Sequence, residues 1–192
     1  MSRRLLVALL AGGEGRRIGG AKPQRRFGGE TLLARALRTA RHWSEDLKVV
    51  VRAPDQADGA PFLLDDPAIA GPLGGLAAAL RFARAQGYES VLTLPCDMPF
   101  APAELADRLC AAVGPGAAVA ASGGELHPVC ALWPAAALDR LDSYLATGRR
   151  SLRGFAEAVG FVAVEWPVEP FDPFFNINDE ADLRRAEAML QS

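Results

Sequence analysis

The chain has 192 residues and a formal net charge of −2. This length fits one domain with a sizeable core, and the low net charge gives no overall positive field for nucleic acid or an anionic membrane. No apolar run approaches the roughly 20 residues that span a bilayer, and no signal peptide is expected. Three scattered cysteines without C-x-x-C spacing indicate a reducing compartment. We therefore expect a cytoplasmic protein that binds neither nucleic acid nor membrane.

Apolar strand segments alternate with helical segments along the chain. The expected strands are Leu5–Ala11, Leu47–Val51, Pro61–Leu64, Ser90–Leu94, Ala117–Ala121, Val129–Trp133 and Val162–Trp166. The expected helices are Glu30–His42, Leu76–Gln86, a segment opening at Pro102, Ala135–Ala146, Ser151–Val159 and a last helix beginning near Asp179. This alternation predicts an α/β fold, with a mostly parallel sheet flanked by helices in a single domain over residues 1–192.

A glycine-rich, cationic loop follows the first expected strand. Its residues are Gly12, Gly13, Glu14, Gly15, Arg16, Arg17, Ile18, Gly19, Gly20, Ala21 and Lys22. Glycines allow close backbone approach to a ligand, and successive N–H groups form a concave anion site. Ala21 before Lys22 excludes a P-loop, and Ile18 excludes the dinucleotide-binding fingerprint. The loop predicts a polyphosphate site, with a glycine turn carrying solvated arginines as the alternative.

An aspartate stands at the end of the expected strand Ser90–Leu94, between two prolines. In Pro95-Cys96-Asp97-Met98-Pro99 the carboxylate of Asp97 is rigidly held. A carboxylate only accepts hydrogen bonds and is a hard oxygen ligand for Mg²⁺, which commonly takes one or two carboxylates plus phosphate oxygens. Asp97 therefore predicts a magnesium ligand beside a triphosphate, whereas a helix N-cap would have to lie closer to Pro102.

Weaker signals occur elsewhere, and each has a structural alternative. Asp66, after Asp65, is a candidate nucleotide or metal contact, or part of a solvated turn. The loop 71–75 is a candidate for close approach to a base or ribose, or a tight turn into a helix. His127 begins an expected strand and is a candidate site residue, or else a structural or surface histidine. The pair Arg149 and Arg150 is a candidate anion site or a solvated pair. Ligands of parallel sheets lie at the carboxyl ends of the strands, where several of these residues are expected to meet.

Several motifs occur together in a recognisable order. They are Leu10-Ala11-Gly12-Gly13-x-x-Arg16-Arg17-Ile18-Gly19-x-x-Lys22, Gly71-Pro72-Leu73-Gly74-Gly75, Pro95-Cys96-Asp97-Met98-Pro99, His127-Pro128 and Phe175-Asn176-Ile177-Asn178. In this combination the chain resembles the molybdenum cofactor guanylyltransferase family from Leu5 to Leu190. The resemblance implies a Rossmann-like nucleotidyltransferase fold, with a nucleotide-binding half over about residues 1–100 and a pterin-substrate half over about 101–192.

The resemblance also implies a reaction and its participants. GMP would pass from GTP to the phosphate of molybdopterin or Mo-molybdopterin, giving the guanine dinucleotide cofactor and pyrophosphate, with Mg²⁺ as cofactor. Cofactor-delivery proteins and molybdoenzymes are the implied partners. Related cytidylyltransferases usually have an alanine in the paired-glycine position, so Gly12-Gly13 with Pro72-Leu73 looks more like the guanine-selective group.

The implied site residues fall into three groups. The resemblance implies that the nucleotide is contacted by Leu10, Ala11, Gly12, Gly13, Lys22, Arg52, Asp66 and Asp97. Arg16, Lys22 and Asp97 carry the catalytic roles, with Asp97 also holding the metal. The pterin substrate is assigned to His127, Arg149, Arg150 and Asn178. Arg52 stands where family members can have an asparagine, and the short alignment before Gly71 leaves Asp65 as a substitute for Asp66.

Two rival functions fit parts of the same pattern. A sugar-1-phosphate nucleotidyltransferase shares the first loop but usually has a longer loop before the lysine and a larger substrate region. A non-catalytic nucleotide-binding partner protein would bind GTP without releasing pyrophosphate. The presence of both Lys22 and Asp97 favours an enzyme.

Overall fold

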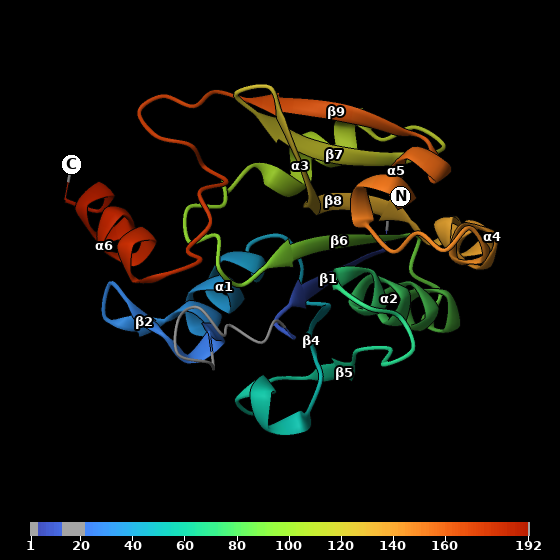
Figure 1. Cartoon of the computed structure of the whole chain (residues 1–192), viewed down its shortest axis with the longest axis horizontal. Helices are drawn as coiled ribbons and strands as arrows, with labels where there is room; N and C mark the ends of the chain where they lie inside the picture. Colours follow the sequence, from blue (N-terminus) through green and yellow to red (C-terminus); the bar gives the residue numbers. More distant parts are fainter. Residues whose placement is uncertain (1–3, 13–21, 192) are drawn as a thin grey trace.

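The computed structural model describes residues 4–12 and 22–191, and its centre is a seven-stranded sheet (Figure 1). The strands of this sheet are β1 (Leu5–Leu10), β4 (Leu47–Val51), β5 (Phe62–Leu64), β6 (Ser90–Pro95), β7 (Ala117–Ser122), β8 (Glu125–Pro134) and β9 (Phe161–Trp166). Their order is β5-β4-β1-β6-β8-β7-β9, and β8 is antiparallel to both of its neighbours. The other adjacent pairs are parallel, which confirms the expected α/β fold.

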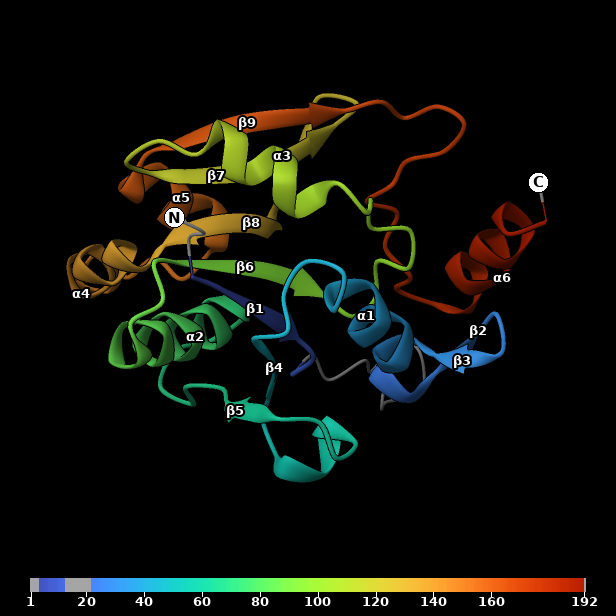
Figure 2. The ribbon, with the colours of Figure 1, turned by 180° about the vertical axis from the view of Figure 1, so that it is seen from behind.

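Helices cover both faces of the sheet (Figures 1 and 2). The helices are α1 (Leu32–Ala40), α2 (Pro72–Gln86), α3 (Leu105–Ala112), α4 (Leu141–Ala146), α5 (Leu152–Val159) and α6 (Glu180–Met189). On one face, Leu33 of α1 and Leu109 of α3 join a buried cluster with Leu9 of β1. On the other face, α2, α4 and α5 pack around Trp133 and Leu6. A strand such as β1, buried on both sides, has the continuous apolar sequence that such burial requires.

Some elements differ from their expected bounds. Helix α2 begins at Pro72 rather than Leu76, because Gly71 takes a φ of 77° at the N-cap and proline is favoured at the first helical position. The expected helix Ala135–Ala146 divides into a 3₁₀ turn over Ala135–Arg140 followed by α4. A short hairpin of β2 (Arg26–Phe27) and β3 (Glu30–Thr31) was not expected.

Strand β8 is irregular where it passes the end of β6. Its register with β7 shifts, because Val119 pairs with Ala131 whereas the next residue, Ala120, pairs with His127. Pro128 lies within the shifted stretch and has no N–H to donate to the ladder. The irregularity therefore bends the strand beside the carboxyl end of the parallel strands.

After β9 the chain returns to the centre of the molecule, and α6 then lies beside the hairpin of β2 and β3 (Figures 1 and 2). Ala186 of α6 and Ile177 of the returning segment are buried against Phe27 and Leu32. None of the helices in residues 4–12 and 22–191 has the length and apolar character needed to cross a membrane.

Candidate active site

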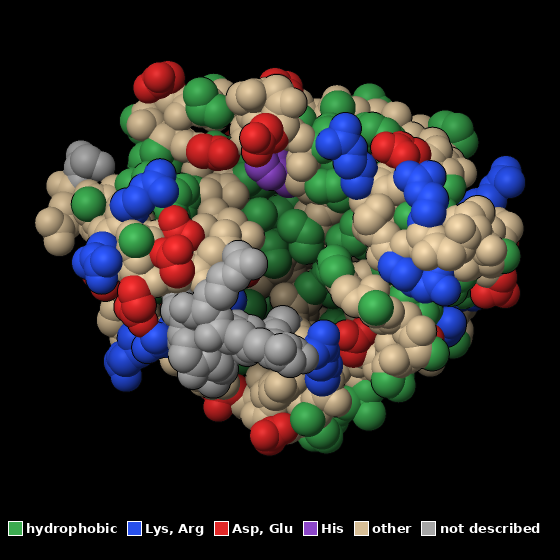
Figure 3. All heavy atoms as spheres, viewed as in Figure 1, with side chains coloured by type: hydrophobic (Ala, Val, Ile, Leu, Met, Phe, Trp, Pro, Cys, Tyr) green, Lys and Arg blue, Asp and Glu red, His purple; other side chains and the backbone are tan. Residues whose placement is uncertain are grey.

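A cavity of about 360 Å³ lies at the carboxyl ends of β1, β4 and β6. It is lined by Leu10, Gly12, Val50, Arg52, Asp65, Gly71, Pro72, Gly75, Pro95, Asp97, Val129 and Asn176. Figure 3 shows that this face of the molecule is hollowed near its centre and that hydrophobic side chains line the hollow. A pocket with apolar walls and a few polar groups is typical of a small-molecule site.

Asp97 lies two residues after the end of β6 and is held by two contacts, one to its side chain and one to its backbone. Its Oδ2 is 2.5 Å from Lys22 Nζ, which also donates to Asn178 Oδ1 at 3.2 Å. Its backbone carbonyl accepts a hydrogen bond from the N–H of Ile177 at 3.0 Å. The structure thus joins the first loop's lysine, the aspartate after β6 and the C-terminal segment in one place.

Three buried oxygens of the cavity lack a hydrogen-bond partner within the described part of the chain. They are Asp65 Oδ1, Asp97 Oδ1 and Asn176 Oδ1, and all three residues line the cavity. A buried polar atom without a partner costs about 1–3 kcal/mol. Buried oxygens without a partner suit the binding of a ligand that supplies hydrogen-bond donors, or of a hard cation.

The donor set suits a divalent cation shared with a substrate. The residues that the structure describes contain no group of three or more His, Cys, Asp or Glu side chains that could hold a metal by themselves. Mg²⁺ usually binds through one or two carboxylates, with water and substrate phosphates completing the shell. Asp97 Oδ1, with Asn176 Oδ1 lining the same cavity, fits this mode of binding.

The two neighbouring aspartates after β5 have different surroundings. Asp65 lines the cavity, with Oδ2 4.0 Å from Arg52 Nε, and burial raises the pKa of its carboxyl. Asp66 Oδ2 is 2.6 Å from Arg81 Nη1, and Oδ1 accepts from the N–H of Ala68 at 2.9 Å. The bond to Arg81 lowers the pKa of Asp66. Asp65 therefore occupies the place in the cavity where the sequence led us to expect Asp66, which borders an adjacent cavity.

Glycines of α2 let the surrounding loops approach closely. A Cβ on Gly74 would collide with Asp65 Oδ1 and with the backbone carbonyls of Ile69 and Asp66. A Cβ on Gly75 would lie 3.1 Å from Leu10 Cδ2. The paired glycines therefore give Asp65 and Leu10 room on one wall of the cavity.

The remaining nucleotide-binding expectations are placed as follows. Leu10, Gly12 and Arg52 line the cavity, and Ala11 is buried between Leu10 and Gly12. Gly13 and Arg16, expected to meet phosphates, lie outside the described residues.

The expected pterin contacts are not all at the cavity. Asn178 bonds Lys22, and His127 lies on β8 two residues before Val129. His127 Nε2 is 2.7 Å from Ser122 Oγ, and burial lowers the pKa of the imidazole. Arg149 and Arg150 are exposed between α4 and α5 and do not line the cavity.

The two arginines already have protein partners. Arg149 Nη2 is 3.0 Å from Glu157 Oε2, and its guanidinium lies over the Tyr144 ring. Arg150 Nη1 donates to the carbonyls of Leu145 and Arg149 at 2.8 and 2.7 Å. Both guanidinium groups are thus engaged by residues of α4, α5 and the loop between them, and neither arginine lines the cavity that holds Asp97.

The sequence did not point to three residues that line the cavity, namely Asn176, Val129 and Val50. Asn176 was noted only as part of Phe175-Asn176-Ile177-Asn178, and the signal that would have found it is a polar residue between two buried hydrophobic ones, Phe174 and Ile177. Val129 enters through the irregularity of β8, which no periodicity shows.

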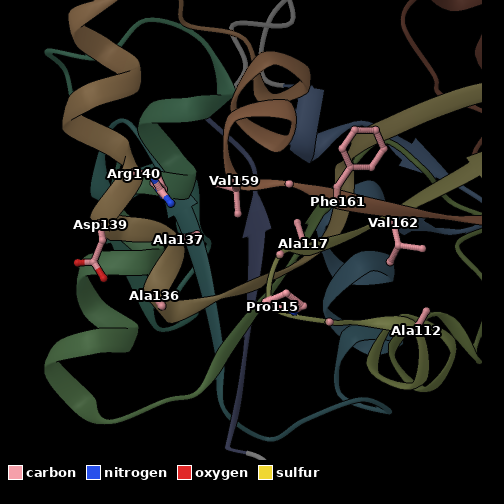
Figure 4. A pocket seen from close by; sticks show the side chains of 13 residues that line it. Ala112, Pro115, Ala117, Ala136, Ala137, Asp139, Arg140, Val159, Phe161 and Val162 are labelled. Atoms are coloured by element: carbon pink, nitrogen blue, oxygen red, sulfur yellow. The ribbon is translucent and has the colours of Figure 1, made fainter.

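A larger cavity of about 840 Å³ lies at the N-terminal ends of β7 and β9, away from the carboxyl ends of the strands (Figure 4). It is lined mainly by small and apolar residues, and its charged side chains are Asp139 and Arg140. Asp139 Oδ1 is 2.8 Å from Arg84 Nη2. None of the buried oxygens that lack a hydrogen-bond partner among the described residues belongs to this cavity, whereas the smaller cavity holds three, so the smaller one is the candidate active site.

Known proteins are similar to this chain in both sequence and fold. The family model of the MobA-like NTP transferase domain matches residues 7–160. A molybdenum cofactor guanylyltransferase of Cereibacter sphaeroides is 39% identical, over 98% of both chains, and one of Acidiphilium cryptum is 44% identical, over 96% of this chain and 94% of its own.

Solved structures agree. The molybdopterin-guanine dinucleotide biosynthesis protein A of Archaeoglobus fulgidus has 30% identity and a TM-score of 0.75, over 96% of this chain and 98% of its own. A 4-diphosphocytidyl-2C-methyl-D-erythritol synthase of Anaerococcus prevotii, with 16% identity and a TM-score of 0.79 over 99% and 97% of the two chains, shares the fold.

Proposed function

The chain belongs to the MobA-like family of nucleotidyltransferases, and we propose that it transfers GMP from GTP to the phosphate of molybdopterin or Mo-molybdopterin. The products are the guanine dinucleotide form of the cofactor and pyrophosphate. The observation that carries the proposal is a set of three oxygens, from Asp65, Asp97 and Asn176, that have no hydrogen-bond partner within residues 4–12 and 22–191 and lie in one cavity beside Lys22. The guanylyltransferases named above support the choice of substrates.

Asp65 supports guanine as the base. A carboxylate only accepts hydrogen bonds. Guanine presents two adjacent donors, N1–H and the 2-amino group, whereas cytosine presents one amino group and, next to it, the acceptors N3 and O2. Leu10, Val50 and Val129 provide apolar walls for a flat ring in the same cavity. A site that pairs with donors rejects a base without them, because its own buried oxygen then stays unpaired. Asp65 takes the role that the sequence had assigned to Asp66.

The polyphosphate is assigned to Lys22, Gly12 and the loop between them. Lys22 is 13% exposed and is held between Asp97 and Asn178, so its ammonium is fixed beside the metal ligand. On phosphate binding it would exchange one of these contacts for an oxygen of the leaving pyrophosphate. Gly13 and Arg16 are proposed to bind the same phosphates, and Arg52 at the cavity wall is proposed to contact the nucleotide.

Asp97 is the proposed ligand of Mg²⁺. When bound, the cation would neutralise the α-phosphate against an anionic nucleophile, since unit charges about 4 Å apart interact by roughly 4 kcal/mol at an effective dielectric constant near 20. The nucleophile is the phosphate of the acceptor, so the chain needs no nucleophilic side chain of its own. Its residues act by positioning and by electrostatic stabilisation.

The acceptor is proposed to approach from the side of β8 and the C-terminal segment. His127 and Asn178 are the proposed contacts close to the cavity, and Arg149 and Arg150 are proposed to meet the pterin phosphate only if their present contacts are exchanged. We further propose that the reaction takes place in the cytoplasm and that delivery proteins or molybdoenzymes receive the product.

A pyrophosphate-release assay tests this function. Purified protein with Mg²⁺ and molybdopterin should release pyrophosphate with GTP and far less with CTP or ATP, and the variant Asp97→Ala should lose on the order of a hundredfold in turnover. Preference for CTP would identify a cytidylyltransferase. Release with GTP and a sugar 1-phosphate, but not with molybdopterin, would contradict the proposed acceptor. Binding of GTP with no release at all would contradict catalysis.

A further inference from the structure

Three polar side chains fasten the segment that carries Asn176 to the β7–β8 hairpin. Ser122, at the end of β7, donates through Oγ to Asp172 Oδ1 at 2.8 Å, and His127 Nε2 lies 2.7 Å from the same Oγ. Because the hydroxyl has one proton and gives it to the carboxylate, the imidazole is the donor in the second bond. A continuous chain therefore runs from His127 N–H through Ser122 to Asp172.

This chain fixes one end of the segment. The N–H of Phe174 also donates to Asp172 Oδ1, at 2.9 Å. The Phe174 ring stacks on His127 at a centroid distance of 4.7 Å and meets Trp166 edge-on at 5.3 Å. Phe174 is 2% exposed. The residue two positions before Asn176 is therefore held to the hairpin by burial, by its ring stack on His127 and, through Asp172, by the hydrogen bond to Ser122.

The other end of the segment is fixed at the site. The N–H of Ile177 donates to the carbonyl of Asp97 at 3.0 Å, and the side chain of Ile177 is fully buried with Phe27 and Leu32. Asn176 lies between the two anchors and lines the cavity, with its Oδ1 buried and unpartnered among the described residues.

The chemistry of the three side chains suits a permanent contact. Ser122 is 2% exposed, and removal of its hydroxyl would take one hydrogen-bond partner from each of the partly buried side chains of Asp172 and His127. Burial lowers the pKa of His127, although the nearby carboxylates of Asp172, Glu125 and Glu165 oppose this. The neutral ring keeps its one proton on Nε2, where Ser122 accepts it.

We propose that Ser122, Asp172 and His127 form a clamp that holds Asn176 Oδ1 in the nucleotide cavity. Ser122 and Asp172 are positioning residues on this account, since their bonds reach the hairpin and the segment rather than the substrate. The expected effect of the clamp on Mg·GTP binding rests on the proposed function. The clamp itself is a property of the protein without ligand.

Hydrogen–deuterium exchange tests the clamp directly. In Ser122→Ala the amides of residues 174–177 should exchange at least tenfold faster, because the segment loses the hydrogen bond that holds the charged Asp172 side chain to the hairpin. Ser151→Ala is the matched control, since Ser151 Oγ also accepts a hydrogen bond, from the N–H of Gly154, but caps α5 away from the cavity. Unchanged exchange in the segment, or an equal increase in the control, would overturn the clamp.

A double-mutant cycle tests its consequence. Ser122→Ala should weaken Mg·GTP binding about tenfold, measured by calorimetry without acceptor, but should weaken it less than twofold in an Asn176→Ala background. Equal effects in both backgrounds would show that Ser122 does not act through Asn176.

A second pair of variants guards against misfolding of Ser122→Ala. Asp172→Asn keeps an acceptor oxygen for Ser122 and for the N–H of Phe174, so it should bind Mg·GTP more tightly than Asp172→Ala. Equal binding by the two would contradict the clamp. If the wild type does not bind Mg·GTP at all, the proposed function fails, while the exchange experiment still decides whether the clamp exists.

Discussion

At the scale of single residues, two adjacent aspartates with the same side chain differ in role because their surroundings differ. Asp65 lies in the cavity with an unpartnered Oδ1 among the described residues, and Asp66 is engaged by Arg81 and by the N–H of Ala68. The sequence shows the pair but not which member turns inward, because that depends on how the loop meets Gly74.

The two aspartates can be separated by matched substitutions. Asp65→Asn replaces an acceptor by a group that also donates, so kcat/KM for GTP should fall at least tenfold, given about 1.5–3 kcal/mol for hydrogen bonds to a charged group. Asp66→Asn should leave kcat/KM nearly unchanged and should only lower the melting temperature slightly, through the weakened contact with the half-exposed Arg81. A larger kinetic loss in Asp66→Asn than in Asp65→Asn would contradict the assignment.

His127 gives the protein a pH dependence whose sign can be stated. Burial lowers the pKa of its imidazole in the folded protein, so below the unfolded value of about 6.5 the unfolded chain binds the proton more readily. The free energy of unfolding should therefore decrease as the pH falls from 7.5 to 5.5. In urea titrations His127→Gln should show a smaller decrease over this range. An identical decrease in the variant and the wild type would refute this contribution.

At the scale of elements, the sequence predicted most strands and helices, and the exceptions have local causes. Strand β1, before Gly12, is a continuous apolar run, and β6, before Asp97, is apolar except for Ser90 and Thr93, so both sequences agree with the burial of these strands. The start of α2 was misplaced because Pro72 and the glycines after it resemble a loop in composition, although Gly71 and Pro72 together begin a helix. The bend of β8 depends on its pairing with β7, which local sequence does not encode.

The N-terminal turn of α2 can be tested by adding one methyl group. Gly74→Ala would press a Cβ against Asp65 Oδ1 and two backbone carbonyls, so it should destabilise the protein by about 1–3 kcal/mol and weaken GTP binding. Gly114→Ala is the control, since its Cβ would meet no described atom within 4 Å. Urea titration and calorimetry measure the two effects. Wild-type stability and affinity in Gly74→Ala would contradict this, because they would show that the loop of residues 65–69 accommodates a methyl group at position 74.

At the scale of the whole molecule, the topology decides where chemistry takes place. Four parallel strands, β5, β4, β1 and β6, end at one edge of the sheet, and the C-terminal segment returns across that edge to contact Asp97 and Lys22. The strand-end rule predicted this convergence from the sequence. The return of residues 172–178 depends on long-range burial of Phe174 and Ile177, so no local pattern predicted how it completes the site.

The most direct test of the account is a crystal structure with Mg²⁺ and a GTP analogue whose α,β-bridge cannot be cleaved. We expect the guanine to lie between Leu10 and Val129, with N1–H and the 2-amino group donating to Asp65, and a cation on Asp97 Oδ1 that also contacts the α-phosphate. The nucleotide in the larger cavity at the starts of β7 and β9, or an Asp97 carboxylate without a cation, would contradict it.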